Sequence, residues 1–229
     1  MENLMNLMNV DIVFCVDTTG NIPDLVYYLK DNIEKICNDV RARLEEEVTY
    51  IGDFRVKFVS FKDIYYDDNS LMESKFFLIP NDMKELKEYL LPFEPDGGGD
   101  KEESSLEAIS LALKSEWNNS SPRCRQVIVL FTDNPSHEFL EKDYARIDVS
   151  GFPKDLDELK AIMLGENKEY NPAFNHKKLR FIAITPYVYP FNELIEEIPN
   201  SYSVPVLENN GLKDLELEDL SKIIVDGLR

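Results

Sequence analysis

Basic residues are scarce in this sequence, and several other features are absent. The 229 residues include 25 Lys and Arg against 44 Asp and Glu, which gives a net charge of −19. Such a charge repels phosphate backbones and anionic lipid headgroups, so we expect neither nucleic acid nor a membrane surface as a partner. No apolar run reaches about 18 residues, the length that suggests a transmembrane helix. The first nine residues lack the basic and apolar parts of a secretory signal, so we expect a cytoplasmic protein.

Several nucleotide and metal signatures are also missing. No Gly-Lys-Ser/Thr follows a predicted strand, and the glycines at 97–99 lack the Gly-x-Gly-x-x-Gly spacing of a dinucleotide site. Counted from Asp17, the sixth residue is Ile22 and the twelfth is Tyr28, which excludes an EF-hand loop. The cysteines are odd in number and far apart, and Cys15 and Cys37 lie in apolar patterns. We therefore expect buried, reduced thiols.

Apolar runs alternate with amphipathic patterns along the chain. Continuous runs rich in Val, Ile and Phe are typical of parallel strands buried on both faces. They cover 10–16, 126–132 and 179–184, with a further strand at 54–61 and an antiparallel edge strand at 75–79. Helical periodicity covers 23–47, 83–91, 106–117, 156–164 and 215–228. This alternation predicts an α/β fold with a mostly parallel sheet between helices and one antiparallel edge strand. We expect a single domain over 1–229 with an irregular insertion at about 134–178.

Three polar segments follow predicted strands or precede helices. Asp17, Thr19 and Asn21 come directly after the first strand, Asp100 follows three glycines, and Asp133 ends the strand at 126–132. In open parallel sheets, ligands bind outside the carboxyl ends of the strands, so the three aspartates can meet in one crevice. Carboxylates so placed repel one another unless a cation joins them. Because the expected ligands are hard oxygens with no convergent His or Cys, Mg²⁺, Mn²⁺ or Ca²⁺ fits, and Zn²⁺ does not.

These segments resemble the von Willebrand factor A family. The Asp17-x-Thr19-x-Asn21 turn after VDIVFCV is similar to the Asp-x-Ser/Thr-x-Ser signature that opens the family's metal-ion-dependent adhesion site. FVSFKDIYYDD, GGGDKEESSLEAISLAL and VIVLFTDNPSH resemble the later signatures of its bacterial branch, so the motifs cover about 10–137. The resemblance implies a three-layer α/β/α, Rossmann-like fold. It also implies a cation with one open position, which a partner's carboxylate commonly fills. The sequence departs from the pattern at Asn21, where a hydroxyl residue is usual, and at Asp100, where many members have Thr.

Other interpretations of these residues remain open. A haloacid-dehalogenase-like phosphotransferase also places an Asp after its first strand, but it needs a second acid where this chain has Thr19. An A-type scaffold with a non-functional metal site is the other alternative. For His137 we expect a solvated or loop-capping role in preference to a catalytic one. We expect a solvated turn at Asp63, Asp67 and Asp68, in preference to a rim that supports the cation.

We therefore expect a protein-binding module and not an enzyme. The metal set is Asp17, Thr19, Asn21, Asp100 and Asp133. The expected partner is a protein that presents Asp or Glu to the metal, with Lys or Arg around it, because a bare acidic surface would be repelled by this chain.

Overall fold

A mixed β-sheet forms the middle layer of the protein. The computed structural model describes residues 7–20, 22–47, 50–139, 148–210, 212–213 and 215–229. Within these residues, seven strands form the sheet in the order β3-β2-β1-β5-β6-β7, and β4 also pairs with β2. The strands are β1 (Met8–Asp17), β2 (Ile51–Phe61), β3 (Leu71–Glu73), β4 (Phe77–Leu78), β5 (Cys124–Phe131), β6 (Leu179–Thr185) and β7 (Ser201–Pro205). Only the pairings of β3 and β4 with β2 are antiparallel.

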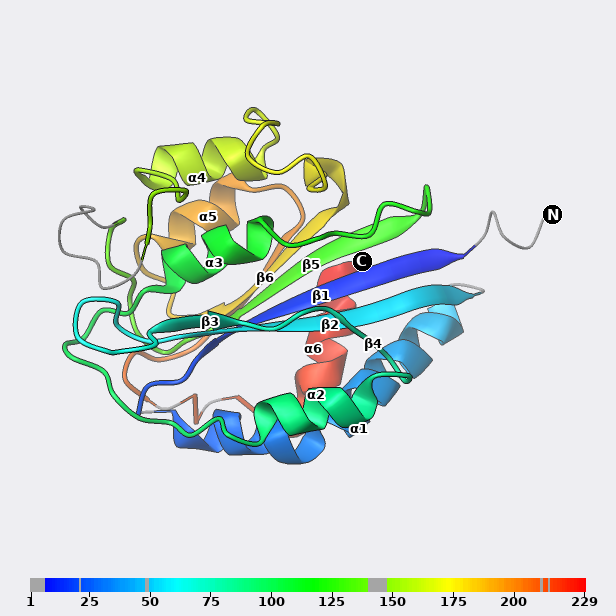
Figure 1. The fold of residues 1–229 in the computed structure, drawn as a ribbon, viewed down its shortest axis with the longest axis horizontal. Coiled ribbons are helices and arrows are strands. Elements are labelled where there is room, and N and C mark those ends of the chain that lie inside the picture. The colour runs from blue at the N-terminus through cyan, green and yellow to red at the C-terminus, as the bar shows by residue number, and fades with distance from the viewer. Residues whose placement is uncertain (1–6, 21, 48–49, 140–147, 211, 214) are drawn as a thin grey trace.

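Helices cover both faces of this sheet (Figure 1). One face is covered by α1 (Pro23–Glu47), α2 (Met83–Leu90) and α6 (Leu220–Leu228). The other face is covered by α3 (Ser105–Leu113), α4 (Leu156–Met163) and α5 (Phe191–Glu197). Short 3-10 helices at His176–Lys178 and Leu217–Asp219 precede β6 and α6. The predicted three-layer α/β/α architecture is therefore confirmed.

The core lies on both sides of the central strands. Successive side chains of a strand point to opposite faces. Phe14 packs toward α1 beside Phe58 and Phe131, with ring centroids 5.1 and 6.2 Å away, whereas Val13 and Cys15 pack toward α3. Full burial of one such side chain stabilises the fold by about 1.5–3 kcal/mol. This two-sided burial explains why β1 is apolar at seven of its ten positions, including all of 12–16.

Most elements match the sequence-based expectations, with local differences. The helix predicted to reach Trp117 ends at Leu113, and the predicted antiparallel edge consists of two short pieces, β3 and β4. Strand β7 and helix α5 were not predicted. The cysteines are free and buried, as expected. Among the helices that the structure describes, none has the length and hydropathy needed to span a bilayer.

Candidate metal centre

The carboxyl ends of β1 and β5 form the centre of one edge of the sheet, at the left of Figure 1. These two strands are hydrogen-bonded neighbours. The chain leaves β1 toward α1 on one face and leaves β5 toward α4 on the other face. A crevice opens at such a reversal of direction, and ligands bind there in open α/β sheets. Asp17 ends β1 and Asp133 follows β5 by two residues, so topology brings both to this crevice.

Asp17 is fully buried and organises the first loop. Its Oδ1 accepts hydrogen bonds from the Thr19 backbone N–H at 2.9 Å and from the Thr19 hydroxyl at 2.6 Å. Its Oδ2 accepts a hydrogen bond from the Thr132 hydroxyl at 2.8 Å. Burial raises the pKa of Asp17 to about 6; the bonds from Thr19 and Thr132 act in the opposite direction, and the nearby charge of Asp133 raises it further. The bonds from Thr19 and Thr132 thus fix the position of both oxygens of the carboxylate.

The structure describes three of the four remaining predicted ligands, and their environments differ. Asp133 is fully buried, and its backbone carbonyl accepts a hydrogen bond from the Asn209 N–H at 2.9 Å. Thr19 is buried beside Asp17. Asn21 lies outside the described residues. Asp100 is about half exposed, and its Oδ1 accepts a hydrogen bond from the Glu102 N–H at 2.9 Å.

The glycine loop at 97–99 is held against two other loops. The Gly20 N–H donates to the Gly97 carbonyl at 3.4 Å, which ties it to the Asp17 loop. The Gly98 N–H donates to Asp67 Oδ2 at 2.9 Å. Gly97 has a φ of +74°, and a Cβ there would overlap the Asp67 carboxylate. The glycines are therefore needed for close approach of backbone and for left-handed conformation.

Glu103 is a buried carboxylate that the sequence interpretation missed. Its side chain lies beside Gly98, and its Oε2 has no hydrogen-bond partner. Burial raises the pKa of Glu103 to about 9, and the charges of four aspartates raise it further. In order of effect these are Asp17, Asp63, Asp67 and Asp100. The negative charges of Asp17 and of the loop that contains Asp63 therefore both act on Glu103. The acid-rich stretch after the glycines was the available sequence signal.

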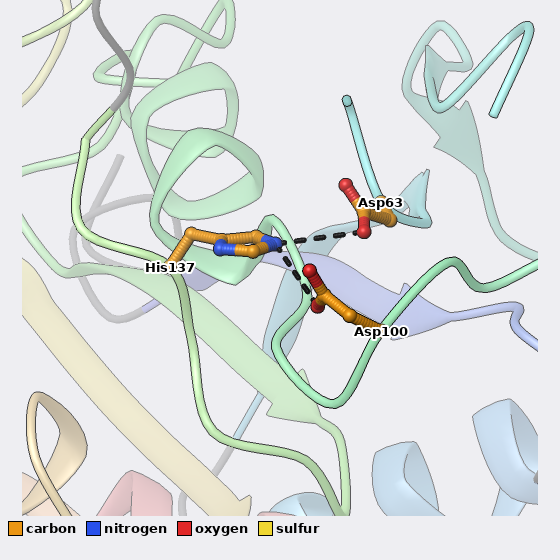
Figure 2. A group of neighbouring side chains, drawn as sticks. All are labelled: Asp63, Asp100 and His137. Carbon is orange, nitrogen blue, oxygen red and sulfur yellow. Dashed lines mark ion pairs between the residues drawn. The ribbon is translucent and has the colours of Figure 1, made fainter. Parts of the chain in front are cut away.

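Asp63, Asp100 and His137 form a second group of converging side chains (Figure 2). His137 Nε2 lies 3.5 Å from Asp63 Oδ2 and 3.5 Å from Asp100 Oδ1. Asp63 is fully buried, and this burial raises its pKa. Two expectations were therefore wrong: Asp63 is not part of a solvated turn, and a histidine does converge with the carboxylates. Asp67 and Asp68, in contrast, are half-buried and exposed.

Helix α3 begins beside these groups without using the expected caps. Neither Asp100 nor Ser104 caps the helix through its side chain. The Ser104 hydroxyl accepts a hydrogen bond from the Ile64 N–H at 3.0 Å, and the Ser136 hydroxyl accepts one from the Leu106 N–H at 3.4 Å. Ser136 also donates to the Glu103 carbonyl at 3.1 Å. These bonds join the loops after β2 and β5 to the start of α3, and thereby fix the positions of Glu103 and His137.

The donor set of this edge fits a bound cation. Buried carboxylates without a cationic partner are costly, and an ion that coordinates their oxygens removes that cost. Glu103 Oε2 and Asp63 Oδ2 are buried atoms without hydrogen-bond partners. The Asp-Asp-His group at residues 63, 100 and 137 could hold a metal ion, since its ligand atoms lie within 4.8 Å of one another.

Comparisons with known proteins find similarities in both structure and sequence pattern. The SpaC pilus adhesin of Lactobacillus rhamnosus GG has a similar fold, with a TM-score of 0.54 and 13% identity over 97% of this chain. This chain spans only 31% of the length of that adhesin. Proximal thread matrix protein 1 of the mussel byssus gives a TM-score of 0.48 at 16% identity, over 95% of this chain and 46% of that protein. No curated protein matches the sequence. The pattern of the von Willebrand factor A domain matches residues 11–146, so the chain belongs to the von Willebrand factor A domain family.

Proposed function

We propose that this chain is a protein-binding module whose contact depends on a divalent cation at the carboxyl edge of the sheet. The cation would be Mg²⁺ or Mn²⁺, with Ca²⁺ as the alternative hard ion. The side chains that would hold it are those of Asp17, Thr19, Asn21, Asp100 and Asp133. The family supports this proposal, because the resemblance of these motifs implies a metal-ion-dependent adhesion site.

One structural observation supports the proposal most strongly. Asp17 and Glu103 are both buried, and burial raises the pKa of each carboxyl group. The charge of Asp133 raises the pKa of Asp17 further, and the charge of Asp17 raises that of Glu103. Within the described residues, no Lys or Arg forms an ion pair with either carboxylate. Natural proteins seldom bury carboxylates without a counter-charge, and a metal ion is a counter-charge small enough to bind between carboxylate oxygens.

The partner is proposed to present an Asp or Glu side chain to the cation. A hard divalent ion held by few carboxylates keeps open positions that water or an external carboxylate can fill. The rim around the site is acidic, with exposed Asp68, Asp100 and Glu102. Lysine or arginine around the partner's carboxylate would offset repulsion from this rim and speed encounter. The SpaC protein with the same fold is by its name an adhesin, which agrees with a binding role for the fold.

The first experiment measures cation binding directly. Mn²⁺ binding to the metal-free protein is followed by calorimetry or by water-proton relaxation, for the wild type, Asp17→Ala and Asp31→Ala. Asp31 is exposed on α1, so its substitution changes the net charge equally without touching the site. We expect Asp17→Ala to lose binding and Asp31→Ala to retain it. Equal binding by all three proteins would remove Asp17 from the site.

The second experiment distinguishes the contribution of the cation to partner binding from that of the basic residues around the partner's carboxylate. Partners are captured from an extract of the native cells in Mg²⁺, in EDTA and in high salt, with the wild type and Asp133→Ala. We expect the partner to be lost in EDTA and with Asp133→Ala, because both remove the metal contact. High salt should weaken capture by screening the basic surround. A partner retained in EDTA and by Asp133→Ala would favour the scaffold alternative.

A further inference from the structure

The Asp63–Asp100–His137 group brings together three separate loops at the rim. Asp63 follows β2, Asp100 follows the glycines at 97–99, and His137 follows β5. Figure 2 shows the two carboxylates pointing toward the same ring nitrogen. This group lies outside the hydrogen-bonded set of Asp17, Thr19 and Thr132.

The contacts between His137 and the two aspartates are ion pairs that are long for charge-assisted hydrogen bonds. Charge-assisted N–H···O bonds measure about 2.7–2.9 Å, whereas Nε2 of His137 lies 3.5 Å from each carboxylate oxygen. Both Asp63 Oδ2 and His137 Nε2 are buried atoms with no hydrogen-bond partner. The Asp63 side chain is fully buried, and its unpartnered oxygen points toward the imidazole. The direct ion pairs are therefore long, and they leave two buried polar atoms that face each other without a short hydrogen bond.

The same distances fit ligands around a small metal ion. Zinc binds imidazole nitrogen and carboxylate oxygen at about 2.0–2.2 Å, so two ligands at a tetrahedral angle lie about 3.3–3.5 Å apart. The two measured separations from Nε2 are both 3.5 Å. The two carboxylate oxygens lie within 4.8 Å of each other, so all three ligand atoms are near enough to surround one ion.

The histidine is also held in the form that a metal requires. Its Nδ1 lies 3.1 Å from Glu102 Oε2, so Nδ1–H can donate to that carboxylate and leave the lone pair of Nε2 free. Metal-bound histidines almost always have such a partner on the second ring nitrogen. The ring of Tyr65 packs edge-on against the imidazole at a centroid distance of 5.0 Å, which further fixes its orientation.

We propose that Asp63, Asp100 and His137 bind a divalent transition-metal ion of the zinc class, at a position distinct from that of the hard cation near Asp17. Asp100, which the proposed function also assigns to the hard cation, would be shared between the two positions. Imidazole suits Zn²⁺, Co²⁺ and similar ions, whereas Mg²⁺ and Ca²⁺ prefer sites made only of oxygen. Three protein ligands leave a fourth position for water or for a further carboxylate. The ion joins the loops after β2, after the glycines and after β5, and so stabilises the rim itself.

The test uses the fact that the chain has only two histidines, His137 and His176. Zn²⁺ is added to the metal-free, ¹⁵N-labelled protein, and the imidazole signals are followed by NMR, with His176→Ala used for assignment. We expect the His137 signals to move to those of a ring coordinated through Nε2, and the His176 signals to stay. In parallel, Co²⁺ should give the visible absorption bands of a tetrahedral site, and Zn²⁺ should abolish them.

Variants identify the ligands. We expect His137→Ala and Asp63→Asn to weaken Zn²⁺ binding by at least about 100-fold. Even the mutation of a residue that only hydrogen-bonds to a metal ligand typically lowers metal affinity by about 10–100-fold. Asp68→Asn is the matched control, because Asp68 is exposed in the same loop as Asp63. Unchanged His137 signals with Zn²⁺, or equal affinities of wild type and His137→Ala, would overturn the proposal.

One further arm separates this site from the proposed function. Asp17→Asn should lose the Mn²⁺ site near Asp17 but keep the Co²⁺ bands. If the wild type shows the Co²⁺ bands but captures no partner through a cation, only the proposed function is refuted. Absence of the bands with Mn²⁺-dependent capture intact would refute only this inference.

Discussion

Replacement of Glu103 by glutamine should change stability and metal affinity in opposite directions. The metal-free wild type buries this carboxyl group, and its pKa is raised to about 9 by burial and by four aspartates. In the unfolded chain the same group ionises near its usual value of about 4.3. Between these two values the unfolded state releases a proton that the folded state retains, so folding stability falls as the pH rises.

The size of this effect follows from the proton balance. One proton held only by the folded state costs about 1.4 kcal/mol of stability for each pH unit. From about pH 6 to about pH 8, Glu103 therefore removes up to about 3 kcal/mol from the metal-free wild type. Glu103→Gln keeps the shape of the side chain but cannot ionise, so this part of the slope should vanish. Burial also raises the pKa of Asp17 and Asp63, whose contributions have the same sign and remain in the variant.

The assay is urea denaturation across this pH range, in EDTA and in excess Mg²⁺. A cation stabilises the ionised form of Glu103, so Mg²⁺ should flatten the slope of the wild type. In Glu103→Gln, the slope in EDTA should be shallower, and Mg²⁺ affinity should fall by about tenfold or more. Glu46→Gln is the matched control, because Glu46 is exposed on α1. If Glu103→Gln has the same pH slope as the wild type in EDTA, the buried carboxyl group does not ionise as argued.

Four further outcomes are expected. Mg²⁺-dependent hydrolysis of an aryl phosphate should be absent, because Thr19 occupies the position of the second acid; turnover abolished by Asp17→Asn would favour the phosphotransferase alternative. Gly97→Ala should destabilise the protein by about 2 kcal/mol or more in urea, because its φ is +74° and a Cβ would overlap Asp67. Asp11→Ala should lower the free energy of unfolding by about 3–5 kcal/mol, because it breaks the ion pair with Arg55 at 2.7 Å. Metal binding should persist in this variant, because Asp11 lies toward the opposite end of β1 from Asp17. Thiol reagents should label Cys15 only on unfolding, since burial raises its pKa strongly.

The central strands could be predicted because their environment constrains every position. Residues of β1, β5 and β6 are buried on both faces, so their sequences are almost uninterrupted apolar runs. Strand β7 is an edge strand with half-buried side chains, and its sequence SYSVP has no apolar run. Helix α5 has seven residues, which is too short for a clear helical period.

The candidate site was predictable where it depends on strand ends alone. Asp17 ends β1 and Asp133 follows the neighbouring parallel strand β5, so topology brings both to one crevice. The same rule applies to Asp63, two residues after β2, but its charged neighbours suggested a solvated turn. The position of His137 depends on its backbone N–H, which donates to the Glu103 carbonyl at 3.0 Å. No local sequence pattern encodes that contact, so the histidine could not be placed in advance.

The attachment of Asp17 and Asp133 to neighbouring central strands determines how the domain would respond to a mechanical load. A pull on a partner held at this edge would be transmitted along β1 and β5, each of which is hydrogen-bonded to a parallel strand on both sides. The force would run along the strands, so the hydrogen bonds between them would be loaded together in shear and not opened one after another. The edge strands β3 and β7 and the helices would lie outside this line of force. The same topology that gathers the carboxylates would thus anchor a bound partner to the most deeply buried part of the sheet.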